Sequence, residues 1–268
     1  MSQQRRADWQ LPPGVTRGLA DYVESEHIAE DYDDFFAANS LFEFDEAVIA
    51  RHFRRPGLVA DLGCGTGRAL LPLLRRGFRG LAVDLSPAML RIVREKAELD
   101  ALSVDVVLAN LVELDCVADE VADYALSMFS TLGMIQGRQN RARALRHMQR
   151  ILKPGGKGVL HMHNVWTNLF DPPGRRYLMT HLPRALLAAL RGRDDVELGD
   201  KVMPYRGIPH VYLHSFTCGQ LRRGLRAAGF DILEVIPLSA TRQRPLTHGW
   251  WLPRLRANGW IAVVRKPA

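Results

Sequence analysis

A short glycine-rich segment between two acidic residues is the part of this chain best suited to bind a nucleotide. The segment runs Val59-Ala-Asp-Leu-Gly-Cys-Gly-Thr-Gly, and the second acid ends the run Leu81-Ala-Val-Asp84. Glycines at alternate positions let the backbone turn tightly and approach a ligand closely, because no Cβ stands in the way. A carboxylate at Asp84 can accept hydrogen bonds from both hydroxyls of a ribose. The third glycine comes one residue too early for the pyrophosphate cradle of dinucleotide-binding folds, so the pattern disfavours NAD.

The residues around this segment predict alternating strands and helices. We expect strands at 58–62, 80–84, 104–109, 121–127, 157–163, 230–236 and 258–265, and helices at 66–76, 87–99, 138–152 and 217–228. Strands that alternate with helices favour a parallel sheet covered on both faces. The expected fold class is therefore α/β, with a doubly wound, mostly parallel, Rossmann-like sheet.

Two stretches fall outside this alternation. Residues 1–20 contain Pro12-Pro13-Gly14 and are expected to be a flexible lead, whereas 21–54 look helical. Residues 165–216 follow the fifth strand and contain Asp171-Pro-Pro-Gly, which we expect to be a turn, and an amphipathic stretch interrupted by Pro183. We expect an N-terminal arm and helical cap at 1–54 and one domain at 55–268. Within that domain, 165–216 would be a substrate-cap insertion that closes one lid with 21–54.

Composition is that of an ordinary soluble globular chain, with 268 residues, 47% apolar and 24% charged. No run of about eighteen apolar residues occurs, so no membrane span is expected. The three cysteines are scattered, without the spacing of metal ligands or of disulfide frameworks. We therefore expect no metal, a reducing cytoplasmic location, and a monomer or homodimer.

Charge is distributed unevenly along the chain. The net charge is +7, yet residues 21–50 hold ten acids and no Lys or Arg, and residues 138–193 hold twelve Lys or Arg and one acid. Such asymmetry predicts an anionic partner or contact between the two segments. The alternative is that the arginines of 138–152 form the solvated face of one amphipathic helix.

Four motifs in register resemble the class I S-adenosylmethionine-dependent methyltransferases, in particular their small-molecule type 11 and type 25 groups. The motifs are Asp61-Leu-Gly-Cys-Gly-Thr-Gly, Val83-Asp-Leu-Ser-Pro-Ala-Met-Leu, Ala122-Asp-Tyr-Ala-Leu-Ser-Met-Phe and the segment 145–156 that ends in Lys-Pro-Gly-Gly. The resemblance covers residues 55–164 closely and 217–266 more loosely. It implies a seven-stranded sheet whose last strand is antiparallel and lies between the fifth and sixth. It also implies S-adenosylmethionine as cofactor and S-adenosylhomocysteine as product.

The resemblance assigns most of the cofactor's contacts to the two acidic residues and the glycines. Asp61 matches the acid that meets the methionine amino group, and the backbone at Gly63 and Gly65 would lie under the methionine and ribose. Asp84 would bind the ribose, with Leu85 packing on the adenine.

Further cofactor contacts are implied at the ends of the third and fourth strands and in the cap. Asn110, followed by Leu111, stands where the family often has an Asp that accepts from the adenine amino group, and an amide oxygen can accept the same bond. Ser127 and Met128 would lie beside the methionine. Tyr32 resembles a cap tyrosine that touches the same moiety, and a half-buried helix tyrosine is the alternative.

Histidines near two strand ends are the candidates on the substrate side. His163 falls at the carboxyl end of the fifth strand, where ligands bind in open parallel sheets, and is the candidate general base. His210, Tyr212 and His214 would bring substrate-binding groups to the end of the insertion. Each of these residues could instead serve packing alone.

The expected function is transfer of a methyl group to O or N of a small molecule, mainly by proximity and orientation. The Asn/Asp-Pro-Pro-aromatic motif of methyltransferases that act on the amino groups of adenine or glutamine is replaced by Ser127-Met-Phe-Ser. One alternative is a tRNA or rRNA methyltransferase, which the basic segment 138–193 would favour. Another is a non-catalytic S-adenosylmethionine-binding protein, which the intact Asp61 and Asp84 disfavour.

Overall fold

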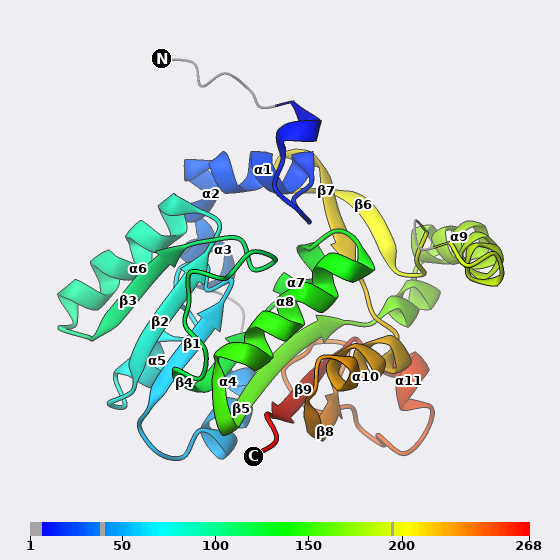
Figure 1. Cartoon of the computed structure of the whole chain (residues 1–268). Coiled ribbons are helices and arrows are strands. Elements are labelled where there is room, and N and C mark those ends of the chain that lie inside the picture. The colour runs from blue at the N-terminus through cyan, green and yellow to red at the C-terminus, as the bar shows by residue number, and fades with distance from the viewer. Residues whose placement is uncertain (1–6, 38–40, 194–195) are drawn as a thin grey trace.

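A seven-stranded sheet forms the centre of the molecule (Figure 1). The computed structural model describes residues 7–37, 41–193 and 196–268. The strand order is β3-β2-β1-β4-β5-β9-β8. The strands are β1 (Leu58–Leu62), β2 (Arg79–Asp84), β3 (Val104–Leu108), β4 (Ala122–Ser127), β5 (Leu152–His163), β8 (Asp231–Pro237) and β9 (Gly259–Arg265). Strands β1 to β5 are parallel, and β9 runs antiparallel between β5 and β8. The predicted fold class and the predicted place of the last strand are confirmed.

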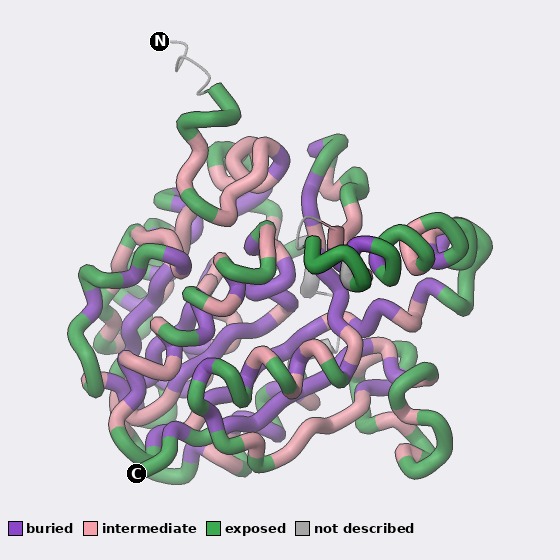
Figure 2. The backbone as a smooth tube through the Cα atoms, turned by 45° about the vertical axis from the view of Figure 1, so that its right-hand side comes forward, coloured by how far each residue is buried: buried purple, intermediate pink, exposed green. Residues whose placement is uncertain are grey.

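Helices cover both faces of the sheet, as the sequence predicted. On one face lie α4 (Leu41–His52), α5 (Leu71–Leu74) and α6 (Pro87–Leu99), which bury Ile49, Leu71 and Val93 against the strands. On the other face lie α8 (Arg138–Ile151) and α10 (Cys218–Ala227), which bury Met148 and Leu221. Figure 2 shows the buried residues concentrated along the central strands. Because both faces are covered, these strands are almost continuously apolar.

A cap of short helices and a β-hairpin covers the carboxyl ends of the parallel strands. Its helices are α1 (Arg17–Glu24), α2 (Glu26–Glu30) and α3 (Tyr32–Ala37), and its hairpin is β6 (Asp200–Tyr205) and β7 (Ile208–His214). Helix α1 lies beside β7 (Figure 1), so close that a Cβ on Gly18 would come within 1.9 Å of the carbonyl oxygen of His210. Ile28, Met89 and Val211 form a small core between the cap and α6. Segments far apart in sequence therefore build one cap.

The segments that build the cap differ from the lid that the sequence predicted in two respects. Helix α4 packs on the sheet, so 21–54 is not one unit. Residues 1–6 of the expected lead lie outside the described residues, and the rest of it is not loose, since Thr16 caps α1 by accepting from the Leu19 N–H at 3.2 Å. The carbonyl of Gly14 also accepts from the N–H of Gln136 at 2.9 Å.

Asp171-Pro-Pro-Gly starts a helix and is not the turn we expected. Helix α9 (Pro172–Leu190) begins there, and the Asp171 carboxylate accepts from the Gly174 N–H at 2.8 Å, as a capping acid does. Pro183 lies inside α9 without ending it. Helix α9 packs on the 3₁₀ segment η2 (Val165–Phe170), at the side of the molecule. Within the described residues, no helix is both long and apolar enough to cross a membrane.

Candidate active site

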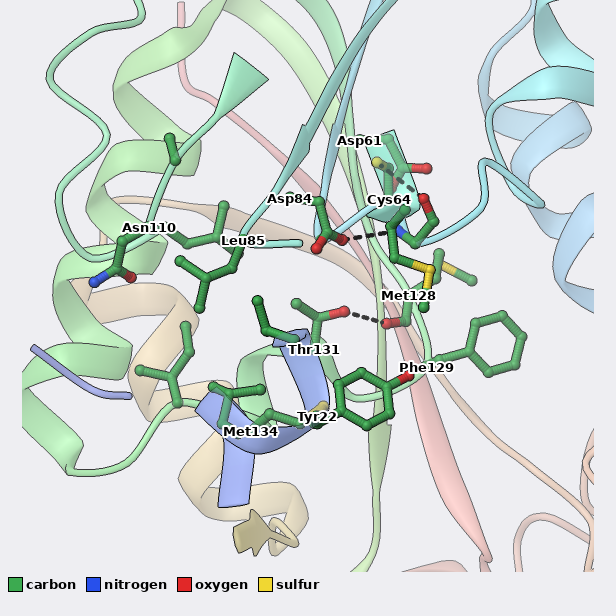
Figure 3. Close-up of a pocket in the computed structure, with 18 of the residues that line it drawn as sticks. Tyr22, Asp61, Cys64, Asp84, Leu85, Asn110, Met128, Phe129, Thr131 and Met134 are labelled. Carbon is green, nitrogen blue, oxygen red and sulfur yellow. Dashed lines mark hydrogen bonds between the residues drawn. The ribbon is translucent and has the colours of Figure 1, made fainter. Parts of the chain in front are cut away.

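The glycine-rich turn after β1 forms the floor of a cavity at the carboxyl ends of the strands (Figure 3). The space between the lining atoms, with its open mouth, is about 1030 Å³. Gly63 has a φ of +79°, and a Cβ there would come within 2.2 Å of the Thr131 side chain, so only glycine fits. At Gly65, with a φ of +53°, a Cβ would meet nothing within 4 Å. The turn thus presents bare backbone to the cavity.

Asp84 ends β2 beside this turn and is held by two backbone donors. The Gly65 N–H donates to one carboxylate oxygen and the Ser86 N–H to the other, each at 2.9 Å. Burial raises the pKa of Asp84, while these two hydrogen bonds oppose the rise. Each carboxylate oxygen still has a free acceptor position, because an ionised carboxylate offers about four. The arrangement can therefore accept two hydroxyls of a sugar.

Asp61 is a buried acid with a carboxylate oxygen that has no hydrogen-bond partner. Its side chain lines the cavity, the residue is 1% exposed, and its Oδ2 has no hydrogen-bond partner. Burial, helped by the charge of Asp84, raises the pKa of Asp61 to about 7. A buried carboxylate without a donor is unfavourable, so the site calls for a cationic or hydrogen-bonding group of a ligand.

A mostly apolar wall continues from β2 to the loop after β3. Leu85, Ala109, Asn110 and Leu111 line it. The Asn110 amide donates to the carbonyl of Pro13 at 2.9 Å, and its oxygen accepts from the Val112 N–H at 3.1 Å. An amide oxygen can accept two hydrogen bonds, so one acceptor position remains for the expected role toward an adenine amino group.

The N-terminal segment supplies lining residues that the sequence did not suggest. Gly14, Val15, Leu19 and Tyr22 line the same cavity. In Figure 3, Tyr22 lies on the side of the cavity opposite to Asp61. The proline-glycine composition of the lead obscured this role, although the spacing of Val15, Leu19 and Tyr22 at intervals of three to four residues was an available signal.

The loop after β4 forms the junction between this cavity and a second one. Phe129 and Ser130 have φ values of +51° and +64°, a left-handed conformation that costs a non-glycine residue about 1–2 kcal/mol. Ser130 is fully buried, and its N–H donates to the carbonyl of His161 at 2.9 Å. Its hydroxyl accepts from the His163 N–H at 3.3 Å. These bonds hold Met128 and Phe129 in the cavity wall.

Nine of the ten residues expected to bind the cofactor line the first cavity. They are Tyr32, Asp61, Gly63, Gly65, Asp84, Leu85, Asn110, Leu111 and Met128. The tenth, Ser127, is buried within β4 and is not a lining residue, because successive side chains of a strand point to opposite faces.

A cluster of polar contacts fastens α3 to the glycine-rich turn. The Thr66 hydroxyl donates to Asp33 at 2.7 Å, and Lys96 forms an ion pair with the same carboxylate. Next to this cluster, Arg68 lines the cavity, and the charge of Asp33 opposes the burial that lowers its pKa. Among the described residues, the cap acids Asp33 and Glu30 thus pair with Lys96 and Arg91 of α6, which is one way in which the acidic segment meets the rest of the chain.

A second cavity adjoins the first and shares part of its wall. Tyr22, Tyr32, Phe129 and Met134 line both cavities. The remaining lining residues of the second are His163, Met203, Tyr205, Val211, Leu213 and Arg242. The candidate base His163 therefore lies in a mainly aromatic and apolar cavity beside the expected cofactor site.

His163 is a neutral group in this surrounding. Burial lowers its pKa to about 4, and the charges of Arg242 and Lys201 add to the effect. Its neighbour His161 is 1% exposed, has no hydrogen-bond partner for either ring nitrogen, and packs edge-on against His163 with ring centroids 5.6 Å apart. A neutral His163 can accept a proton, but it is a weaker base than an ordinary histidine.

The three residues expected to bind substrate on β7 do not reach either cavity. His210 is exposed, and the side chains of Tyr212 and His214 are buried away from the cavities, where both hydrogen-bond to Asp200 at 2.6 and 2.7 Å. Val211 and Leu213 line the second cavity instead. Alternate residues of a strand point to opposite faces, and here the polar set has its own buried partners.

Those partners form a charged network behind the hairpin. Arg141, at 4% exposure, pairs with Glu197 and donates to the Tyr212 hydroxyl at 3.0 Å. Glu197, Asp200 and His214 bring ligand atoms within 4.8 Å of one another. The guanidinium of Arg141 already balances this charge, so the cluster is a structural network.

Comparison with known proteins agrees with the geometry. Residues 59–156 match the family model described as a methyltransferase domain. The match contains the glycine-rich turn, Asp84 and the loop after β4, which are the parts that build the first cavity. Residues 59–156 are thus similar to a methyltransferase domain, and the strand order is that of the class I S-adenosylmethionine-dependent methyltransferases, whose cofactor is S-adenosylmethionine.

Relatives among curated proteins match parts of the chain. An uncharacterized protein of Methanocaldococcus jannaschii is 27% identical over 149 residues, 56% of this chain and 53% of that protein. The match therefore spans about half of that relative's length. A ubiquinone biosynthesis O-methyltransferase of Acinetobacter baylyi is 22% identical over 214 residues, which cover 78% of this chain and 76% of that enzyme.

A solved structure shares the fold over most of the chain. The 1,6-didemethyltoxoflavin-N1-methyltransferase of Burkholderia thailandensis, with bound 1,6-didemethyltoxoflavin and S-adenosylhomocysteine, is 20% identical, with a TM-score of 0.61. The match covers 93% of this chain and 87% of that one. At this identity the likeness shows the fold.

Proposed function

We propose that this protein transfers the methyl group of S-adenosylmethionine to an oxygen or nitrogen atom of a small molecule held in the second cavity. The observation that carries the proposal is the shared wall. Tyr22, Tyr32, Phe129 and Met134 line both the cavity with Asp61 and Asp84 and the cavity with His163. Two ligands in these cavities would meet at that wall, as an in-line displacement requires.

The residues of the first cavity fit the cofactor in their chemistry. Asp84 would accept from the ribose hydroxyls, Leu85 would pack on the adenine, and Asp61 would receive the methionine ammonium that its orphaned Oδ2 calls for. Arg68, the cationic residue that lines this cavity among those described, would face the methionine carboxylate. Bound S-adenosylmethionine supplies a methyl group on a sulfonium, which needs no further activation.

The protein's part in the reaction is positioning and exclusion of water. The cap formed by α1–α3 and the β6–β7 hairpin would cover both ligands, and a closed site of this kind keeps a nucleophile in line and dry. His163 would accept a proton from the acceptor or hold it by a hydrogen bond. Because its pKa is about 4, we expect that acidic acceptors need little help from it.

A small-molecule acceptor is supported by the nature of the second cavity and by the relatives. That cavity is lined mostly by aromatic and apolar side chains, as small-molecule sites usually are. The relatives named above include an O-methyltransferase of ubiquinone biosynthesis and an N-methyltransferase of a toxoflavin precursor. The alternative of a tRNA or rRNA substrate has no such support, since several arginines of 138–193 are engaged in ion pairs with acids of the same chain.

The domain division and the location are also proposals. We propose an arm and cap at 1–54, of which α4 packs on the sheet, and a methyltransferase domain at 55–268, in which the β6–β7 hairpin of 165–216 serves as the substrate cap. A cytoplasmic location fits the three cysteines, which are all unpaired. We further propose a monomer or homodimer, which light scattering would distinguish.

The acceptor can be found with a labelled methyl donor. Purified protein and isotope-labelled S-adenosylmethionine are incubated with a small-molecule extract, and mass spectrometry identifies labelled products. We expect label in a small molecule with the wild type and none with Asp84→Ala. Label confined to RNA, together with filter binding that weakens steeply as salt rises, would overturn the small-molecule proposal.

A further inference from the structure

One cationic side chain reaches the acceptor cavity, which we define as the second cavity described above. It belongs to Arg242, in the loop between β8 and β9, and no other Lys or Arg is among the described lining residues. The opposite end of the chain's sequence supplies the aromatic walls, Tyr22 and Tyr32, and the hairpin supplies Tyr205. A positive charge in an otherwise aromatic cavity distinguishes this site from a general apolar pocket.

The guanidinium of Arg242 is not satisfied by the protein. Within residues 7–37, 41–193 and 196–268 its side chain makes no hydrogen bond and no ion pair. Asp45 of α4 attracts it, yet no ion pair within 4.0 Å joins the two. None of its nitrogens is a buried atom without a partner, so water reaches the five N–H donors, and an anion that enters the cavity can replace that water.

The charge of Arg242 is only partly compensated by its surroundings. Burial raises the pKa of Asp45 to about 7, so this acid is about half ionised at neutral pH. The other titratable groups near Arg242 are Tyr205, His163 and His161, and the positive charge itself helps keep both histidines neutral. Arg242 is therefore the charged side chain among the described residues that line this cavity.

The backbone holds Arg242 in an uncommon conformation at this position. Its φ is +61°, in the left-handed region that side chains other than glycine rarely adopt. The Arg242 N–H donates to the carbonyl of Ser239, and the Ser239 N–H donates to that of Arg244, both at 3.0 Å. Strain held in place by such a turn is typical of residues placed for a ligand.

We propose that the acceptor is an aromatic compound with an anionic oxygen, and that this oxygen pairs with Arg242. The tyrosines and Phe129 would pack on the ring. The guanidinium would donate two parallel N–H···O bonds to the two oxygens of a carboxylate, or N–H bonds that converge on the single oxygen of a phenolate. The inference rests on the proposed function, because it names the class of molecule that occupies the acceptor cavity.

The two kinds of anion would play different parts. A carboxylate would orient the ring, and a separate hydroxyl or amine would form the bond to the methyl carbon as the carbon–sulfur bond breaks, with its proton passing to His163 or to water. A phenolate would itself be the nucleophile: its lone pair forms the bond to the methyl carbon, and the carbon–sulfur bond breaks with its electrons going to sulfur. No proton then has to be removed in that step, which suits a cavity whose histidine is a weak base.

Matched probe pairs test the proposal in the presence of S-adenosylhomocysteine. Benzoate is compared with benzamide, and 4-nitrophenolate with 4-nitroanisole, by ligand-observed magnetic resonance titration. We expect the wild type to bind at least one anion about tenfold or more tightly than its neutral partner. The pair that shows this preference tells whether carboxylate or phenolate is recognised.

Three variants make the result specific to Arg242. Arg242→Gln should abolish the preference without changing the affinity for S-adenosylhomocysteine, and Arg242→Lys should keep part of it. Arg244→Gln is the matched control, because it removes the same charge from an exposed position of the same loop. Melting temperatures check that each variant is folded.

Three results would overturn the proposal. They are no preference for anions in the wild type, a preference that survives Arg242→Gln, and an equal loss in Arg244→Gln, which would indicate general charge attraction. A wild type that fails to bind S-adenosylhomocysteine would instead contradict the proposed function, so the two failures can be told apart.

Discussion

Replacing Asp61 by Asn should change how cofactor affinity depends on pH. Asp61 is 1% exposed, its Oδ2 has no partner, and its pKa is raised to about 7, first by burial and then by the charge of Asp84. We have proposed that its ionised form receives the methionine ammonium. Below pH 7 the Asp61 carboxyl group is mostly protonated and must lose its proton before it can receive the ammonium. The free energy of that deprotonation weakens cofactor binding.

The size of the effect follows from that pKa. If only ionised Asp61 binds well, the apparent affinity at pH 6 should be about tenfold below that at pH 8, or about 1.4 kcal/mol. Asp61→Asn should bind with an affinity that varies little over this range. At pH 8 the variant should bind about 1–3 kcal/mol more weakly than the wild type, because a hydrogen bond to a charged group is lost.

The stability of the cofactor-free protein should change in the opposite direction. The folded chain keeps the Asp61 proton up to about pH 7, whereas the unfolded chain releases it near the ordinary value of 3.8. This group therefore lowers the free energy of unfolding as the pH rises from about 4 to about 7. Asp61→Asn should remove that decline and raise the melting temperature at pH 8.

Isothermal titration calorimetry with S-adenosylhomocysteine at several pH values measures the binding, and Asp105→Asn, an exposed change on β3, is the control. Wild-type affinity that is constant between pH 6 and 8 would refute the reasoning. A pH dependence that persists in Asp61→Asn would assign the titration to another group, with Asp84 the first to test.

Three further predictions concern the turn, the base and the cap. Gly63→Ala should lower the free energy of unfolding, measured with denaturant, by about 2–5 kcal/mol, because the added Cβ would come within 2.2 Å of the Thr131 side chain. Gly65→Ala should lower it by only about 1–2 kcal/mol, because its Cβ meets nothing within 4 Å, yet it should weaken cofactor binding. Equal stabilities of the two variants would contradict the packing argument. If the acceptor reacts from a hydroxyl or amine that must lose a proton, His163→Ala should lower turnover about a hundredfold and remove a limb of the pH profile near pH 4 in kcat/KM, and near-normal turnover with such an acceptor would show that positioning alone suffices. Amide hydrogen exchange should slow in α1–α3 and in the β6–β7 hairpin when cofactor and acceptor bind, but not in α4, and uniform slowing would argue against a separate cap.

The sheet and the cofactor cavity could be predicted from the sequence because their signals are local. Apolar runs of five to seven residues with intervening helical patterns define the strands, and the fixed φ requirements of Gly63 and Gly65 mark the turn. Asp84, which ends β2, then lies beside this turn. Each of these features depends on residues a few positions apart.

The acceptor cavity was harder to predict because it depends on tertiary contacts. On β7, polar residues at alternate positions suggested a substrate-binding face, yet Tyr212 and His214 bind Asp200, and Val211 and Leu213 face the cavity. Nothing local to the strand tells a buried polar network from a binding face, because both need the same residue types.

Two other differences are explained by particular contacts. The described part of the lead, from residue 7 on, is held in place because the Gly14 carbonyl accepts from the N–H of Gln136, more than a hundred positions away in sequence. At Asp171-Pro-Pro-Gly, an acid before two prolines was a signal for a helix start, since proline favours the first turn and Asp caps it. No signal in the sequence indicated that Arg242 lines the acceptor cavity. Its place there depends on a left-handed loop conformation and on residues from distant segments of the chain.

The central claim is that Asp84 anchors the ribose of S-adenosylmethionine in the first cavity. Calorimetric titration of S-adenosylhomocysteine into the wild type and Asp84→Ala tests it most directly, because no acceptor is needed. We predict one site in the wild type and a loss of about 2–4 kcal/mol of binding free energy in Asp84→Ala, since buried hydrogen bonds to a charged group disappear. A wild type that binds no S-adenosylhomocysteine, or a variant with unchanged affinity, would contradict the claim.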